Sequence, residues 1–204
     1  MFHTPAYSKY GNISYNNPLW QAYRSLYFRL MSNSKQVSTV LIGLIADTHD
    51  NLPMIEKAVE KLNALKVALV LHAGDYVSPF VIPKFKALNS KLIGVFGNND
   101  GDHEFLKKRF SECPNCTVRG RFAEVNADGF KIALLHGDES ELVEALVNCG
   151  GFDAVVHGHS HAVGAVKKGK TLVVNPGEVC GYLTGKSTIA LLDTGKREAR
   201  IIEL

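Results

Sequence analysis

The chain has 204 residues, of which 46% are hydrophobic and 21% are charged. This composition is typical of a globular protein and excludes fibrous, collagen-like and wholly disordered classes. The longest apolar run, residues 40–46, is far shorter than the roughly 18 residues that a membrane-spanning helix needs, so we expect no membrane span. The net charge of +3 comes from residues 1–38, which hold four basic residues and no acidic one, and the remainder carries −1. We therefore do not expect nucleic acid to be a partner.

Residues 1–37 form a basic, aromatic extension that we expect to lie outside the folded core. They hold five of the seven tyrosines and the only tryptophan. Apolar residues between Leu19 and Leu30 recur at roughly helical spacing. Three interpretations stay open: a transit-like or surface-seeking amphipathic helix, a docking segment for another subunit, and a plain appendage or a true start at Met31.

A strand, helix, strand pattern follows the extension. Residues 40–46 form the continuous apolar run expected of a strand buried on both faces. A helix is predicted from Pro53, because apolar residues recur at i, i+3 and i+4 from Ile55 to Leu65. Further strands are predicted over residues 68–71 and 92–96. This alternation predicts parallel strands with right-handed crossovers.

The four cysteines are too few to be the framework of a small disulfide-stapled domain, so a reduced, cytoplasmic location is our expectation. Cys113 and Cys116 form a lone C-x-x-C motif. A zinc site needs four ligands, and the redox motif needs a different setting. We interpret the pair as structural or incidental, with a local disulfide as the alternative.

The second half of the chain is predicted to be rich in strands. Hairpins are expected over residues 122–135, 162–174 and 188–202. A helix over 139–147 precedes a buried strand over 153–156. We predict an α/β chain continued by a β meander, which gives two packed mixed β-sheets flanked by helices. Residues 38–204 contain no linker and are expected to form one domain.

Side chains of the types that bind metals follow five of the predicted strands. They comprise two aspartates, one asparagine and four histidines: Asp47, His49, Asp75, Asn98, His136, His159 and His161. The carboxyl ends of strands in an open α/β sheet form the crevice where ligands bind, so these side chains are aimed at one place. We expect His159 and His161, two residues apart on a strand, to share one face.

The chemistry of this set predicts two divalent metal ions. Oxygen and nitrogen donors without a thiolate suit hard to borderline ions. Seven donors exceed what one ion can use, and they suffice for two ions that share a bridging carboxylate. Mn²⁺ is our first expectation, and Ni²⁺, Fe²⁺, Zn²⁺ and Mg²⁺ are alternatives.

The order of these motifs along the chain resembles that in the calcineurin-like metallophosphoesterase superfamily, most closely in its small single-domain bacterial and archaeal phosphodiesterases. The segments that carry the resemblance are Ala46–His49, His72–Asp75, Gly97–Asp100, Leu135–Gly137 and His157–His161. Asn175–Glu178 and Cys180–Gly185 resemble the closing loop of archaeal members. The resemblance covers residues 39–204 and implies a four-layer α/β/β/α sandwich and, as its small members commonly self-associate, a homodimer or higher homo-oligomer.

The resemblance also implies roles for the seven residues. Asp47, His49 and His161 would hold one ion, Asn98, His136 and His159 the other, and Asp75 would bridge them. A hydroxide between the ions would attack phosphorus in line. Our candidate catalytic residues are Asp75, His49, Asn99 and Asp100.

Asn99 departs from the family pattern. Many members carry a histidine there that protonates the leaving oxygen, and an asparagine cannot supply a proton. Asp100 and His103 are the nearby candidates for that task. His72 and His157 precede metal motifs within buried strands, so we interpret them as structural or supporting groups.

We therefore predict a two-metal phosphodiesterase that hydrolyses small or exposed phosphodiesters. The alternative is a non-catalytic scaffold of the same fold, because a scaffold subunit of the eukaryotic retromer coat also resembles it. The filled set of seven donors favours catalysis, while Asn99 and the aromatic extension keep the alternative open. A nuclease is disfavoured by the near-neutral charge of residues 39–204.

Overall fold

The computed structural model describes residues 21–22, 25 and 39–204. Ser38–Leu204 form one compact unit. Apart from residues 21, 22 and 25, which have helical backbone, the predicted helix around Leu19–Leu30 lies outside the described residues. The three interpretations of the extension therefore remain predictions.

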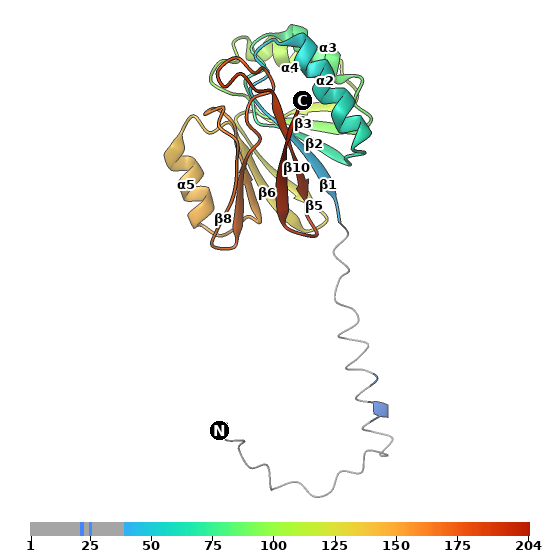
Figure 1. Cartoon of the computed structure of the whole chain (residues 1–204), viewed down its shortest axis with the longest axis vertical. Coiled ribbons are helices and arrows are strands. Elements are labelled where there is room, and N and C mark those ends of the chain that lie inside the picture. The colour runs from blue at the N-terminus through green and yellow to red at the C-terminus, as the bar shows by residue number, and fades with distance from the viewer. Residues whose placement is uncertain (1–20, 23–24, 26–38) are drawn as a thin grey trace, which may run out of the picture. The chain divides into compact units, whose positions relative to one another are not determined.

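Two mixed β-sheets make up the body of this unit (Figure 1). The six-stranded sheet has, in spatial order, β11 (Glu198–Glu203), β10 (Thr188–Asp193), β1 (Leu41–Ile45), β2 (Leu69–His72), β3 (Lys91–Gly94) and β4 (Cys116–Val118). The five-stranded sheet has β5 (Phe122–Ala127), β6 (Phe130–Leu135), β7 (Ala154–Val156), β9 (Thr171–Asn175) and β8 (Gly164–Lys168). Strands β1, β2 and β3 are parallel, as predicted, and β4 continues the parallel order. Strand β10 is antiparallel to both of its neighbours, β1 and β11.

Helices cover the outer faces of both sheets. They are α2 (Leu52–Ala64), the 3-10 helix η1 (Pro79–Val81), α3 (Ile82–Phe85), α4 (His103–Ser111) and α5 (Ser140–Asn148). The longest of them, α2, begins with Asn51 accepting a hydrogen bond from the backbone N–H of Met54, and Pro53 occupies its first turn.

Three apolar cores fill the spaces between adjacent layers. One lies between the six-stranded sheet and helices α2, α3 and α4, and contains Ile45, Leu62 and Phe85. The second lies between the sheets and includes Leu44 and Leu134. A smaller one joins the five-stranded sheet to α5. Because β1 is buried on both faces, it carries the continuous apolar run seen in the sequence. The predicted four-layer arrangement is confirmed.

Parts of the predicted fold were wrong or missing. The second half is not a meander, because β6, β7 and β9 pair in parallel and are joined by crossovers. Helices α3 and α4 and strand β4 were not predicted. Cys113 and Cys116 form a disulfide, which is the alternative we had considered for this pair.

Candidate metal centre

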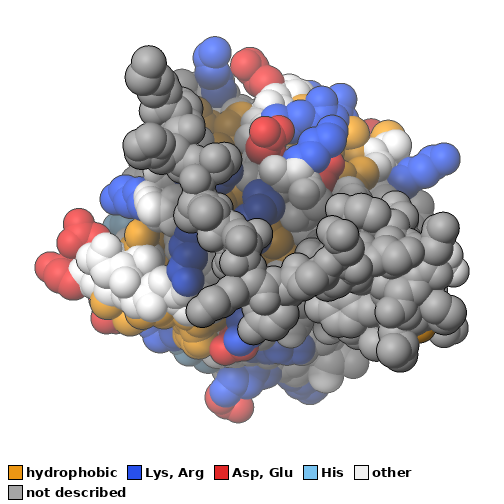
Figure 2. All heavy atoms as spheres, turned by 90° about the horizontal axis from the view of Figure 1, so that it is seen from below, with side chains coloured by type: hydrophobic (Ala, Val, Ile, Leu, Met, Phe, Trp, Pro, Cys, Tyr) orange, Lys and Arg blue, Asp and Glu red, His pale blue; other side chains and the backbone are white. Residues whose placement is uncertain are grey.

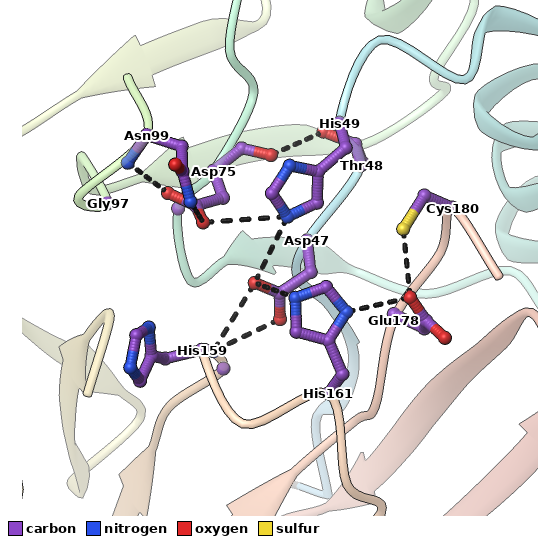
Figure 3. A network of polar contacts seen from close by, with 12 residues as sticks. Asp47, Thr48, His49, Asp75, Gly97, Asn99, His159, His161, Glu178 and Cys180 are labelled. Atoms are coloured by element: carbon purple, nitrogen blue, oxygen red, sulfur yellow. Dashed lines mark hydrogen bonds and ion pairs between the residues drawn. The ribbon is translucent and has the colours of Figure 1, made fainter. Parts of the chain in front are cut away.

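The structure brings all seven predicted donors together at the carboxyl ends of β1, β2, β3, β6 and β7 (Figure 3 shows five of the seven with their neighbours). Asp47 Oδ1 lies 3.9 Å from His49 Nε2 and 3.7 Å from His161 Nε2. Asn98 Oδ1 lies 2.9 Å from His136 Nε2 and 3.0 Å from His159 Nδ1. The donors therefore form two groups of three.

Asp75 lies between these two groups. Its Oδ2 atom is 3.5 Å from His49 Nε2 in one group and 3.3 Å from His136 Nε2 in the other. Asn99 holds this carboxylate, since its backbone N–H donates to Oδ1 at 2.9 Å and its side-chain amide donates to Oδ2 at 2.8 Å. One carboxylate oxygen thus faces a histidine nitrogen from each group.

Two of the histidines present a lone pair to the centre. His136 Nδ1 is 2.8 Å from the carbonyl oxygen of Ala73, and His161 Nδ1 is 2.7 Å from Glu178. Both partners are acceptors, so each Nδ1 atom carries the proton and donates it. The Nε2 atoms then face oxygens that are acceptors as well. Such converging acceptors fit a cation between them.

A third histidine gives the same indication. The Nε2 atom of His49 is buried and has no hydrogen-bond partner within the described part of the chain. A buried polar atom without a partner is costly, and a bound cation would remove that cost. Together with the oxygen and nitrogen donors, this shows that the residues fit divalent metal ions.

Burial and charge perturb the ionisation of both aspartates. Burial raises the pKa of Asp47 to about 7, against the lowering effect of His136 and His161. Burial also acts to raise the pKa of Asp75, but the charge interaction with His136 and the hydrogen bonds from Asn99 outweigh it and hold this pKa well below its usual range. In the metal-free protein, neighbouring groups therefore offset the negative charge of Asp47 only in part.

Backbone strain is concentrated at the donors. The φ angles of Asp47, His49, Asp75, His159 and His161 lie between +37° and +66°. Residues other than glycine rarely adopt this region of φ, and such backbone strain clusters at functional sites.

The prediction that His159 and His161 share a strand face was wrong, because both lie in the loop between β7 and β8. Their loop conformation brings them to different groups.

Two glycines make room for the carboxylates. A Cβ atom at Gly97 would lie 2.1 Å from Asp75 Oδ1, and one at Gly158 would lie 2.7 Å from Asp47 Oδ2. The glycines of the motifs are thus required by the close approach of neighbouring loops.

Asp100 ties two loops together instead of facing the donors. It accepts backbone N–H groups from Asp75, Tyr76, Val77 and Gly97 at 2.6–3.1 Å. Two bonds go to each carboxylate oxygen, which leaves no lone pair free for a proton that could be donated. The geometry therefore argues against the acid role that we considered for Asp100.

Two of the three remaining histidines that follow or precede the metal motifs, His72 and His103, pack against aromatic rings. His103 stacks on Phe96 with ring centroids 4.1 Å apart. His72 is fully buried, lies 3.2 Å from the Thr48 hydroxyl and packs on Tyr76, and burial lowers its pKa to about 3. His157 is partly buried and lies 3.2 Å from the carbonyl oxygen of Gly158. His72 and His157 have the supporting surroundings that we predicted.

Glu178 contacts one of the candidate donors and was not singled out by our sequence reasoning. Its buried carboxylate accepts hydrogen bonds from His161 and from the Cys180 thiol (Figure 3). It also accepts hydrogen bonds from the loop up to Thr184. It therefore fixes both a donor and the closing loop. The signal was present in the Asn175–Glu178 motif, whose acidic residue directly precedes that loop.

A family model described as the calcineurin-like phosphoesterase superfamily domain matches residues 40–197. The chain belongs to this superfamily. A phosphodiesterase of Methanocaldococcus jannaschii is 42% identical to this chain over 163 residues, which cover 80% of this chain and 98% of that phosphodiesterase. The resemblance that the motifs indicated is confirmed.

Solved structures agree with this assignment to the superfamily. The structure of an archaeal phosphodiesterase matches with a TM-score of 0.77 at 42% identity, and the match covers 81% of this chain and 100% of that chain. A Vps29 variant from Entamoeba histolytica matches with a TM-score of 0.59 at 16% identity, over 81% of this chain and 98% of that chain. At that identity the second likeness concerns the fold alone.

Proposed function

We propose that this superfamily member is a phosphodiesterase whose seven donors hold two divalent metal ions. The enzyme class, a metal-dependent phosphodiesterase, is supported by the family and by the 42% identical relative. The two-ion centre rests on one observation above all, the position of Asp75 Oδ2 between His49 Nε2 and His136 Nε2.

The proposed ligand sets follow the two groups. Asp47, His49 and His161 hold one ion, and Asn98, His136 and His159 hold the other. Asp75 is shared. Mn²⁺ is our expectation, with Ni²⁺, Fe²⁺, Zn²⁺ and Mg²⁺ as alternatives, because affinity and availability both decide which ion is bound.

Divalent ions in such a centre lower the pKa of water and offset the negative charge of the phosphoryl oxygens. The chain's own residues orient the donors: Asn99 fixes Asp75, Glu178 fixes His161, and the carbonyl of Ala73 fixes His136. Because Asn99 has no proton to give and the Asp100 oxygens are fully occupied, the leaving oxygen departs without help from either residue. We therefore propose esters with good leaving groups as the preferred substrates.

The remaining features are proposed at the same level. The substrate is a small or exposed phosphodiester, and the catalytic unit is residues 38–204, with 1–37 as an extension. Acidic side chains lie among the basic ones on the face shown in Figure 2, which does not favour nucleic acid as a partner. None of the described helices has both the length and the apolar character needed to cross a membrane. We further propose a cytoplasmic homodimer or higher homo-oligomer.

The experiment that tests this function uses metal-free protein and bis(p-nitrophenyl) phosphate. Mn²⁺, Ni²⁺, Zn²⁺ and Mg²⁺ are added separately, and turnover is expected with at least one of them. Asp75→Asn and His136→Ala should each lose about a hundredfold or more in kcat/KM. Asp193→Asn is the control, because Asp193 pairs with Leu41 at the start of β1, whereas Asp47 follows the other end of that strand. No turnover with any metal ion, or undiminished turnover in the Asp75 and His136 variants, would overturn the proposal.

A further inference from the structure

A cavity of about 440 Å³ adjoins one of the proposed metal ligands. His161 forms part of its wall, next to Val163 in the same loop. Its lining also includes Ile201 and Glu203 of β11, the outer strand of the six-stranded sheet. The cavity therefore lies between β11 and the loop that leads into β8, the outer strand of the other sheet. Its volume is within the range of small-molecule sites.

The walls of this cavity offer little to a charged group. Lys186 and Glu203 are paired at 3.5 Å, so their charges offset each other. The Thr184 hydroxyl donates to Glu178, and the Thr188 hydroxyl donates to the carbonyl of Pro176. Both hydroxyl protons are thus already used. A second phosphate in the cavity would find few donors.

The apolar part of the wall suits an uncharged organic group. Val163 is 54% exposed, so its side chain is available to a ligand, and Ile201 and Ala162 add further apolar surface. Burying such surface against an aromatic ring or a short alkyl chain is favourable by about 25 cal/mol per Å². His161 belongs both to the wall of the cavity and to the donor cluster, so the cavity lies next to the place where a phosphodiester would bind.

We propose that this cavity, defined by His161, Val163 and Ile201, is the subsite for an uncharged, mainly apolar substituent of the phosphodiester. The inference rests on the proposed function and names the class of substrate for the same site. It predicts a preference for esters with an aromatic group over those with a methyl group or a second anionic group.

The test varies the substituent and keeps the leaving group constant. Phenyl p-nitrophenyl phosphate and methyl p-nitrophenyl phosphate are compared on the full Mn²⁺-supplied chain. Val163→Trp fills the cavity and should raise KM for the phenyl ester about tenfold, with less than about a twofold change for the methyl ester. Val166→Trp is the matched control, because Val166 is 53% exposed but does not line the cavity. It should change neither value.

A binding experiment separates this inference from the proposed function. Calorimetry with diphenyl phosphate and dimethyl phosphate needs no turnover. The wild-type chain and Val166→Trp should bind the diphenyl compound about tenfold more tightly, and Val163→Trp should lose that preference. Equal binding of both compounds by the wild-type chain, or a preference that survives Val163→Trp, would overturn the subsite. Absence of turnover together with the expected binding pattern would instead count against the proposed function alone.

Discussion

The Oε2 atom of Glu178 lies 2.7 Å from the Nδ1 atom of His161 and accepts a hydrogen bond from it. This contact fixes which nitrogen of the ring faces Asp47. It also connects the proposed metal centre to the loop up to Thr184, because the same carboxylate accepts backbone N–H groups from that loop. A single buried side chain thus orients a donor and shapes the rim beside it.

We expect Glu178→Gln to weaken Mn²⁺ binding by about ten- to a hundredfold. The substitution removes the charge and places an amide N–H₂ group among N–H donors, so the His161 ring loses its fixed orientation. Titration calorimetry on the metal-free chain measures the affinity. Glu198→Gln, an exposed position at the start of β11, is the control and should bind as the wild-type chain does. Equal affinity in the Glu178 variant would contradict the positioning role.

The same carboxylate should make stability depend on pH. Burial acts to raise the pKa of Glu178, but hydrogen bonds from Cys180, Thr184 and His161 outweigh it and lower the pKa from 4.5 to about 2. The stabilisation is therefore present above pH 4.5 and is lost as the pH falls towards 2. Urea unfolding of metal-free wild-type protein and Glu178→Gln should show a difference in the free energy of unfolding that shrinks over this range. A constant difference would contradict the assignment.

Gly97→Ala should damage the centre without adding any charge. The new Cβ would meet Asp75 Oδ1 at 2.1 Å, so the carboxylate must move. Displacement of about 1 Å at a reacting centre can cost a hundredfold in rate, and overpacking costs about 1–3 kcal/mol of stability. Gly101→Ala is the control, because a Cβ there meets no atom within 4 Å. Steady-state kinetics and thermal unfolding of both variants measure these losses. Equal rates and equal stabilities of Gly97→Ala and Gly101→Ala would show that the close approach of Gly97 to Asp75 is unimportant.

Asn99→His should make the rate of hydrolysis less dependent on the pKa of the leaving group. For a series of methyl aryl phosphates, the wild-type rate should fall steeply as the pKa of the leaving phenol rises, because Asn99 supplies no proton. A histidine there can donate one, so we expect about a hundredfold gain for unsubstituted phenol and little gain for p-nitrophenol. Asn99→Ala separates this effect from the loss of the contact with Asp75. Identical slopes in the wild-type chain and Asn99→His would refute the account.

The sequence was informative wherever one local pattern decides the outcome. The apolar run at residues 40–46 predicted β1, and the periodicity after Pro53 predicted α2. The seven candidate donors could be picked out because each follows a predicted strand, and the structure brings the ends of these strands in both sheets together. The short helix α4 was missed, since its first turn contains His103 and Glu104 and shows no clear apolar stripe.

Properties set by contacts between distant segments could not be predicted. Asp100 looked like an acid because it is close to Asn99 in the chain, whereas its four backbone partners come from loops that only the fold brings together. The backbone of His159 and His161 is held at positive φ by loop packing, which no residue preference foretells. The role of Glu178 likewise depends on a partner 17 residues away.

The central claim is that two metal ions share Asp75, and electron paramagnetic resonance of the Mn²⁺-loaded chain tests it most directly. Two ions bridged by one carboxylate are spin-coupled, whereas separate ions give the ordinary signal of isolated Mn²⁺. With two equivalents of Mn²⁺ per chain, we predict a coupled signal in the wild-type protein and its loss in Asp75→Asn, with Asp193→Asn unchanged. A wild-type chain that binds one equivalent only, or that shows only isolated Mn²⁺ at saturation, would contradict the two-ion centre.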